Sequence, residues 1–372
     1  MKKALLILII LFSLLLTACW DMAEINQRLF VSSIGVDLNE ANGMNKYLVT
    51  YVYPNINAIG KNATEDKKKF TIETASSSLF QAGRKSSTRE EFPFYYKHLK
   101  VFIIGDELAK DSKLIRQVID ELNRDTKINK KIQILVTEGK AKDILDSKAS
   151  HVPITDETIY NILIDNKSAA RFTPQTLTGM IKELDFNNVA ILPKVDKIGD
   201  RVTIAGAAII KDYKLIGYLN EIENRALAFI KNKVKLELID LEYEDGLLSY
   251  NITDNKSSKS VTIDGDINVN IKLKVEGYLQ GYIISKDINV YNNSVLVDME
   301  RAIENQLKKE IEHTINLSQE KYNADLVGIG EYLSKYYPKE WNKIKGKWDQ
   351  IYPDIKFNII VEANIRRTGL TK

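Results

Sequence analysis

The stretch INVNIKLKVE at residues 267–276 alternates apolar and polar side chains without a break. A strand places successive side chains on opposite faces of its sheet, so a period of two predicts a strand with one buried face. Near the end of the chain the pattern recurs with Ile355, Phe357, Ile359, Val361, Ala363 and Ile365 as its apolar set. Both segments therefore predict strands of a sheet that is covered on one face.

Helical patterns fill the sequence between these two strands. One long helix is predicted by an apolar stripe that recurs every four residues, at Met299, Ile303, Leu307, Ile311 and Ile315. A second helix carries Ile329, Leu333 and Tyr336. A third is expected to start after Tyr337 with Pro338 in its first turn, and its apolar face holds Trp341, Ile344, Trp348 and Ile351.

Two more strands precede this region. Residues 234–243 and 247–252 flank Asp245-Gly246, a strong hairpin signal, and a polar loop is expected at residues 254–260. We therefore expect a four-stranded, largely antiparallel sheet with helices packed on one side.

Strand and helix patterns alternate in the first part of the chain. Strands at residues 29–38 and 46–53 are joined by a turn that ends in Asn42-Gly43, and one helix is predicted over residues 106–123. A later helix is predicted over residues 174–184, with Pro174 in its first turn. The patterns predict an α+β protein of mixed α/β domains, and the length of the chain leaves two or three domains open.

Residues 1–18 have the layout of a secretory signal peptide: Lys2-Lys3, then an apolar run that ends at Leu16, then small residues before a cleavage site. The run is too short for a comfortable membrane span, which needs about 20 apolar residues. Cys19 follows the predicted cut directly and is the only cysteine in the chain. The ending Leu-Thr-Ala-Cys resembles a bacterial lipobox, in which the thiol takes a diacylglyceryl group; the alternative is an ordinary signal with a coincidental cysteine.

Lipidation at Cys19 would have a physical consequence, because two acyl chains hold a protein firmly to a bilayer. The mature chain is then expected to be a folded body tethered to the outer leaflet of a membrane. With Cys19 acylated no disulfide can form, so stability must come from burial of the core. Lys and Arg number 53 against 50 acidic residues, and this balance argues against a nucleic-acid partner.

No catalytic, cofactor or metal site emerges from the motifs. His98, His151 and His313 are the only histidines, and none has a second ligand at metal-binding spacing. Trp341 and Trp348 could form a platform for a sugar, but their shared helical face favours a place in the core. We therefore expect a protein that is not an enzyme and that holds neither metal nor cofactor.

One acidic motif is similar to part of a calcium site. Asp264, Asp266, Asn268 and Asn270 resemble the start of a calcium loop, but valines stand where that loop needs Gly and Glu. A turn that enters a strand is the better prediction for this segment.

Four stretches taken together resemble the Ger(x)C lipoproteins, the C subunits of nutrient germinant receptors in endospore-forming bacteria. The first runs from Cys19-Trp20-Asp21 through Ile34-Gly35-Val36-Asp37, and the second is residues 98–109. The third is residues 205–219, and the fourth combines Pro338, Trp341 and Trp348 with residues 365–369. A departure lies at residues 224–230, where family members often carry Arg-Gly-Leu with a tryptophan nearby.

The resemblance implies a lipoprotein of three mixed α/β domains, expected at residues 19–147, 148–230 and 231–372, on the outer face of the spore inner membrane. It implies that the protein acts with two integral-membrane subunits, A and B, and it supplies no catalytic residues. The lipid-free body is expected to bind nutrients weakly or not at all. Two alternatives remain: a lipoprotein solute-binding protein, which needs two similar hinged lobes, and a wall-modifying hydrolase, which needs a nucleophile or a metal set.

Overall fold

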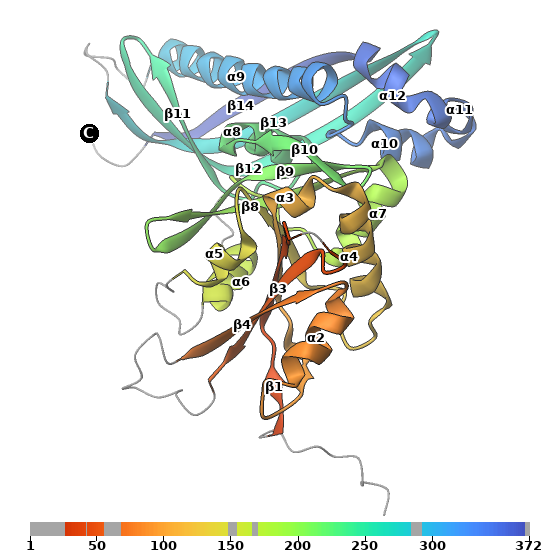
Figure 1. The fold of residues 1–372 in the computed structure, drawn as a ribbon. Helices are drawn as coiled ribbons and strands as arrows, with labels where there is room; N and C mark the ends of the chain where they lie inside the picture. The colour runs from red at the N-terminus through yellow and green to blue at the C-terminus, as the bar shows by residue number, and fades with distance from the viewer. Residues whose placement is uncertain are drawn as a thin grey trace, which may run out of the picture.

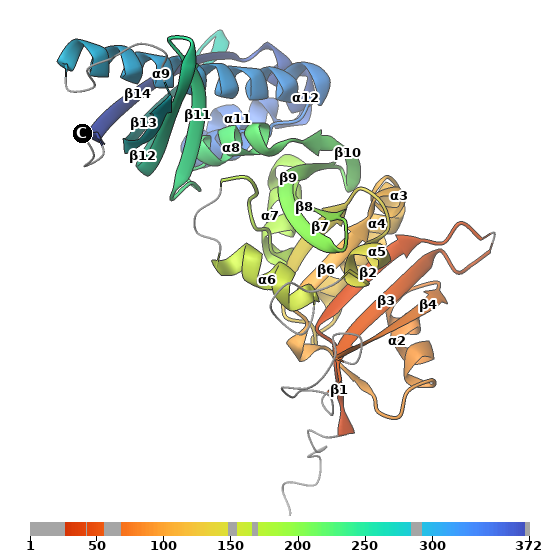
Figure 2. The ribbon, with the colours of Figure 1, turned by 90° about the vertical axis from the view of Figure 1, so that its left-hand side faces the viewer.

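Figure 1 shows the protein as a computed structural model, which describes residues 27–41, 43–55, 68–147, 155–165, 170–283 and 292–368. These residues form two bodies, each built on one large sheet, and the two views agree on this division (Figures 1 and 2). Helix α8 (Glu221–Ile230) lies where the bodies meet. The mixed α/β architecture predicted from the sequence is confirmed.

The larger sheet has eight strands: β2 (Ser33–Leu38), β3 (Tyr47–Pro54), β4 (Lys69–Ser76), β6 (Val101–Gly105), β7 (Gln133–Thr137), β8 (Val189–Ile198), β9 (Arg201–Lys211) and β10 (Lys214–Leu219). Their order is β10-β9-β8-β7-β6-β2-β3-β4, parallel from β8 to β2 and antiparallel toward both edges. A short parallel pair, β1 (Leu29–Phe30) with β5 (Phe94–Tyr95), stands beside it. Strands of the predicted first and middle domains thus share one sheet, and the three-domain division stays a prediction.

Helices cover both faces of this sheet. The helices on the first face are α2 (Leu79–Ser87), α3 (Asp106–Ala109), α4 (Ser112–Arg124) and α7 (Leu177–Asn187); the other face carries α5 (Ala141–Leu145) and α6 (Thr155–Asp165). On β6, Phe102 and Ile104 pack toward the first face, while Val101 and Ile103 pack toward the second. Burial on both faces explains why the central strands are apolar throughout rather than alternating.

Two helix predictions in this body were wrong in detail. The single helix expected at residues 106–123 is two helices, because the Asp111 carboxylate accepts the backbone N–H groups of Lys113 and Leu114, each at 3.0 Å, and so starts a new helix. The helix expected from Pro174 begins only at Leu177, since Thr176 is its N-cap and accepts from the N–H of Gly179. Pro174 lies before the helix rather than in its first turn.

The smaller sheet contains β11 (Glu237–Tyr243), β12 (Gly246–Asp264), β13 (Asp266–Ile283) and β14 (Lys356–Thr368), in that order. Neighbours are antiparallel except β13 and β14, which are parallel. The prediction of a largely antiparallel four-stranded sheet is confirmed. Gly265, with φ of +76°, makes the turn between β12 and β13, where a turn rather than a calcium loop was expected.

The prediction of a polar loop at residues 254–260 is wrong. Strand β12 includes these residues, and they pair with β13. Lysines, serines and asparagines fit there because one face of this sheet is open to solvent. Ser257 and Val261 face inward and are buried, while their neighbours are largely exposed. Polar composition therefore gave no sign of the strand.

Helices cover one face of the smaller sheet, and the other face is open to solvent (Figure 2). They are α9 (Asn293–Asn316), α10 (Ile329–Tyr336), α11 (Pro338–Ile344) and α12 (Trp348–Ile351). The predicted stripe of α9, from Met299 to Ile315, is fully buried against the strands. The single helix expected from Pro338 onward is wrong, because a 3₁₀ turn at Lys345–Lys347 separates α11 from α12.

The two bodies meet through specific contacts between β10 and the segment after α9. Tyr322 donates its hydroxyl hydrogen to the backbone oxygen of Tyr218 at 2.7 Å, across the edge of the larger sheet. Gly217 leaves room for the Tyr322 ring, because a Cβ at that position would lie 2.4 Å from it. A substitution of Gly217 would therefore disturb the junction.

Candidate functional site

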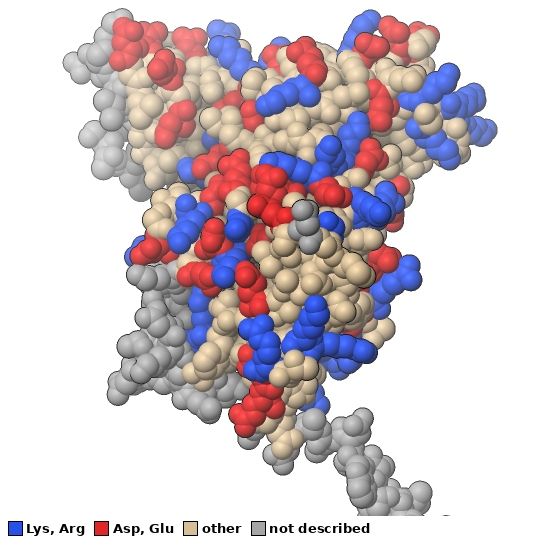
Figure 3. Space-filling model, viewed as in Figure 1, with Lys and Arg blue, Asp and Glu red and all other residues tan. Residues whose placement is uncertain are grey.

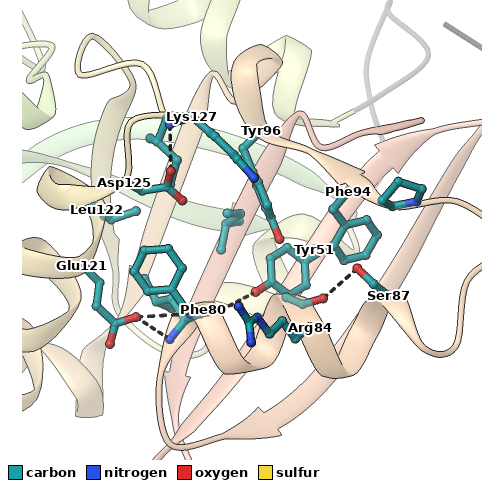
Figure 4. A pocket seen from close by; sticks show the side chains of 15 residues that line it. Tyr51, Phe80, Arg84, Ser87, Phe94, Tyr96, Glu121, Leu122, Asp125 and Lys127 are labelled. Carbon is teal, nitrogen blue, oxygen red and sulfur yellow. Dashed lines mark hydrogen bonds between the residues drawn. The ribbon is translucent and has the colours of Figure 1, made fainter. Parts of the chain in front are cut away.

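The larger body contains a cavity of about 410 Å³ on the first face of its sheet. Figure 4 shows it between α2, the segment at residues 93–96, and the C-terminal half of α4 with the turn that follows. Ile34 and Tyr51 reach it from β2 and β3. Ligand pockets in proteins commonly have about 300–1,000 Å³ and mainly apolar walls.

Aromatic rings form much of the cavity wall. The Tyr51 ring centroid lies 5.0 Å from that of Phe94 and 6.3 Å from that of Tyr96, and Phe94 and Tyr96 meet edge to face. Phe80 of α2 also lines the cavity and is 50% exposed. A large aromatic side chain so open to solvent could gain from covering by a bound molecule.

Local contacts hold α2 in place above the sheet. Its N-cap is Ser78, and the carboxylate of Glu121 on α4 accepts the backbone N–H groups of Leu79 at 2.8 Å and Phe80 at 3.2 Å. Burial raises the pKa of the Glu121 carboxyl, although these two donors oppose the rise. On the sheet side, Tyr51 donates its hydroxyl hydrogen to the backbone oxygen of Leu79 at 3.1 Å.

Gly83 sets the width of the cavity. A Cβ at this position would lie 2.4 Å from the Tyr96 hydroxyl, so only glycine lets that ring approach the helix. The next residue, the exposed Arg84, also lines the cavity (Figure 4). The side chains of Arg84 and Lys127, which both line the cavity, have no hydrogen-bond or ion-pair partner among the described residues. The cavity therefore combines apolar walls with these two cations and with two carboxylates, those of Glu121 and Asp125.

No motif in the sequence predicted this cavity. Its lining comes from five separate stretches, and the only local signals were the aromatic run at residues 92–96 and the Phe80–Arg84 spacing on α2. The residues singled out from the sequence lie elsewhere. Cys19 and His151 are outside the described residues, so lipidation at Cys19 stays a prediction.

The other two histidines do not come together. His98 packs edge to face on Phe30 at 5.1 Å, and His313 lies 3.4 Å from Glu223 on the surface of the other body. Within the described ranges no group of three His, Cys, Asp or Glu residues could hold a metal ion. In the same ranges, no helix is long and apolar enough to cross a membrane.

The two tryptophans meet edge to face with ring centroids 5.1 Å apart. Trp348 is 7% exposed and Trp341 is partly buried, so they do not form one flat open platform. They border a second cavity of about 690 Å³, between the end of α7 and residues 341–350. Its walls are mainly polar. The walls of the first cavity, which Phe80, Gly83 and Arg84 of α2 help to line (the α2 cavity), are mainly apolar.

Other buried charges serve the fold. The Asp325 carboxylate accepts the backbone N–H groups of Gly328, Ile329 and Gly330 at 2.6–3.0 Å and so starts α10. The Asp37 carboxylate holds the start of α5 through the N–H groups of Ala141 and Lys142. Burial raises the pKa of both carboxyl groups.

Positive charge gathers on one part of the face shown in Figure 3. Blue side chains gather at the end of the smaller body that holds α11 (Figure 3). The exposed lysines of this basic surface are Lys335, Lys339, Lys343, Lys345 and Lys347. None of the five has an ion-pair partner among the described residues, and Lys335 lies over the Tyr336 ring. This basic surface is available for contact with an acidic partner.

Comparison with known proteins gives matches along almost the whole chain. The family described as "Spore germination protein N-terminal domain" matches residues 21–197, and "Spore germination B3/ GerAC like, C-terminal" matches residues 205–369. Spore germination protein YndF of Bacillus subtilis (strain 168) is 24% identical over 394 residues, 99% of this chain and 97% of YndF. Spore germination protein A3 of the same organism is 26% identical over 361 residues, 94% of each chain.

The solved structure titled "Crystal Structure of the GerBC protein" has the same fold. It superposes with a TM-score of 0.62 at 21% identity, and the match covers 93% of this chain and 100% of that one. The two family matches, the full-length relatives and the shared fold agree with the resemblance seen in the sequence. This chain therefore belongs to the Ger(x)C family of spore germination proteins.

Proposed function

We propose that this protein is the membrane-anchored lipoprotein subunit of a nutrient germinant receptor, needed for the germination response of the spore. It acts through protein–protein contacts with the integral-membrane A and B subunits of the receptor. The proposal is carried by the full-length correspondence with the spore germination proteins, which spans 99% of this chain in the case of YndF. Neither matched family is described by an enzymatic activity.

Lipidation at Cys19 would fix which body of the protein lies nearest the bilayer. The described chain begins at residue 27, directly before β1, and both views place β1 at the end of the molecule opposite the smaller sheet (Figures 1 and 2). A lipid on Cys19 would therefore put the larger body next to the bilayer. The smaller sheet and the basic surface would then stand farther out, within reach of extracellular parts of membrane subunits.

The solute-binding alternative loses its main support. A hinged binding protein needs two similar lobes with a ligand cleft between them, whereas the two bodies here differ in strand number and strand order. The α2 cavity lies inside one body and not between two lobes.

Membrane fractionation and crosslinking test the proposal. Cys19→Ala should release the protein from membranes of sporulating cells that lack the A and B subunits, while Thr17→Ala, which changes only the variable position of the Leu-x-Ala-Cys ending and keeps it small, should stay bound. In cells that contain both subunits, crosslinking of the wild-type protein should recover A and B. Membrane retention of Cys19→Ala without partners would refute lipidation at this residue, and recovery of neither subunit would refute the receptor role.

A further inference from the structure

We propose that the α2 cavity binds a small apolar carboxylate, with the apolar part between the aromatic rings and the carboxylate on Arg84. The inference goes beyond the receptor role, because it concerns a ligand of this chain alone.

The walls and the volume set the apolar part of the ligand. About 410 Å³ between Tyr51, Phe94 and Tyr96 accommodates one six-membered ring or a short branched chain. Rings that meet at 5.0–6.3 Å leave edges and faces on which another ring can pack. The half-exposed Phe80 at the mouth would be covered by such a guest.

The charges at the rim set the polar part. Oε2 of Glu121 already accepts two backbone N–H groups of α2, and Oδ1 of Asp125 accepts the N–H of Lys127 at 2.7 Å. The side chains of Arg84 and Lys127, by contrast, have no hydrogen-bond or ion-pair partner among the described residues, and of the two only Arg84 carries a planar guanidinium. A guanidinium offers paired N–H groups that match both oxygens of a carboxylate, so an anion of this shape is the complementary guest.

The cavity is held open before any ligand arrives. Glu121 fixes the first turn of α2 to α4, and Tyr51 fixes the same turn to the sheet. Gly83 brings Tyr96 against the helix, so that ring cannot swing inward without meeting the α2 backbone. A site that is already formed loses little conformational entropy on binding.

Ligand-observed NMR on the mature lipidated chain in lipid nanodiscs tests this assignment. The probes are 3-phenylpropionate and its uncharged isostere 3-phenylpropionamide, and empty nanodiscs report partition into lipid. The wild-type chain should bind the acid about tenfold more tightly than the amide, because a charged bidentate pair adds roughly that factor. Phe80→Ala should weaken binding of both probes.

Arg84→Gln should lose the preference for the acid and keep the affinity for the amide. The matched control is Arg201→Gln, an exposed arginine at the start of β9 that lines none of the cavities described above. Because Arg84 is exposed, its replacement should leave circular dichroism melts unchanged. Absence of binding by a folded wild-type chain, equal affinity for acid and amide, or an acid preference retained by Arg84→Gln would each overturn the proposal. None of these outcomes bears on membrane anchoring or on recovery of the A and B subunits.

Discussion

Nη2 of Arg225 lies 2.7 Å from Oε1 of Glu310, which joins α8 to the middle of α9. The two side chains are 13% and 6% exposed, so the pair is almost out of water. Nη1 of the same arginine lies 3.6 Å from Oε1 of Glu237 at the start of β11. One guanidinium therefore ties α8 to both the long helix and the edge of the smaller sheet.

Arg225→Met should strongly destabilise the protein, because it leaves Glu310 and Glu237 buried without a cation. Loss of one partner from a buried pair typically costs about 3–5 kcal/mol. The control is Arg171→Met, which removes a 3.0 Å pair with Glu221 whose side chains are 59% and 46% exposed. An exposed pair contributes about 0–1 kcal/mol. Denaturant midpoints of the two variants decide the matter, and equal shifts would contradict the assigned role of Arg225.

The two tryptophans should differ in their contribution to stability. Trp348 is 7% exposed and packs on Trp341 and Tyr352, so Trp348→Ala should cost about 3–5 kcal/mol. Trp341 is only partly buried, and Trp341→Ala should cost roughly half as much. Urea unfolding of the two variants measures both values. A larger loss for Trp341→Ala would mean that its ring, not that of Trp348, anchors this corner.

Periodicity in the sequence predicted those elements that bury one face and leave the other face in water. The α9 stripe and strand β13 pack one face on a core and leave the other in water, so their periods of four and two are visible in the sequence. Strand β12 was partly missed because its solvent face is polar and its inward face includes Ser257. The split between α3 and α4 depends on one capping carboxylate, that of Asp111. The apolar period continues past Asp111, so the period alone predicted a single helix.

The α2 cavity could not be predicted for a different reason. Tyr51 and Arg84 are brought to one cavity by the pairing of β3 with β4 and by the packing of α2. Both are contacts between distant segments, and no local sequence pattern predicts them. The consequence of Gly83 is equally remote, because it depends on a ring 13 positions away in the chain. Cys19 is the opposite case, since its meaning lies entirely in its sequence neighbours.

Lys259 should give the protein a stability that rises with pH under alkaline conditions. Burial, followed by the nearby Lys231, lowers the pKa of the Lys259 ammonium to about 8, and the ammonium donates to the backbone oxygen of Val327 at 2.8 Å. Between about pH 8 and the ordinary lysine pKa, the unfolded chain binds a proton that the folded chain does not. Raising the pH through this window therefore favours the folded state.

The check is the free energy of unfolding of wild type and Lys259→Met at pH 8 and pH 10. The variant should show a smaller gain than wild type, because the methionine does not titrate. Lys256→Met, on an exposed position of the same strand, should keep the wild-type gain. A wild-type gain that persists in Lys259→Met would assign the pH dependence to another group.

The edge of the smaller sheet that β14 forms should pair with other molecules when two glutamates of α9 are removed. Strand β14 is an edge strand, and its N–H groups at Ala363 and Ile365 are accepted by Glu304 at 3.0 Å and Glu300 at 2.8 Å. Unpaired N–H groups on an edge strand are a template for pairing with another chain. The double variant Glu300→Ala, Glu304→Ala should therefore lose about 1.5–3 kcal/mol per bond and self-associate as its concentration rises.

Sedimentation velocity across a concentration series measures the association, and denaturant melts measure the loss of stability. Glu312→Ala is the matched control, because this α9 glutamate is exposed and contacts only Lys308 at 3.8 Å among the described residues. It should sediment and unfold like the wild-type chain. The double variant could instead sediment like the wild-type chain while its denaturation midpoint is lowered. The two glutamates would then stabilise β14 without preventing association, and solvation by the flanking polar side chains would protect this edge.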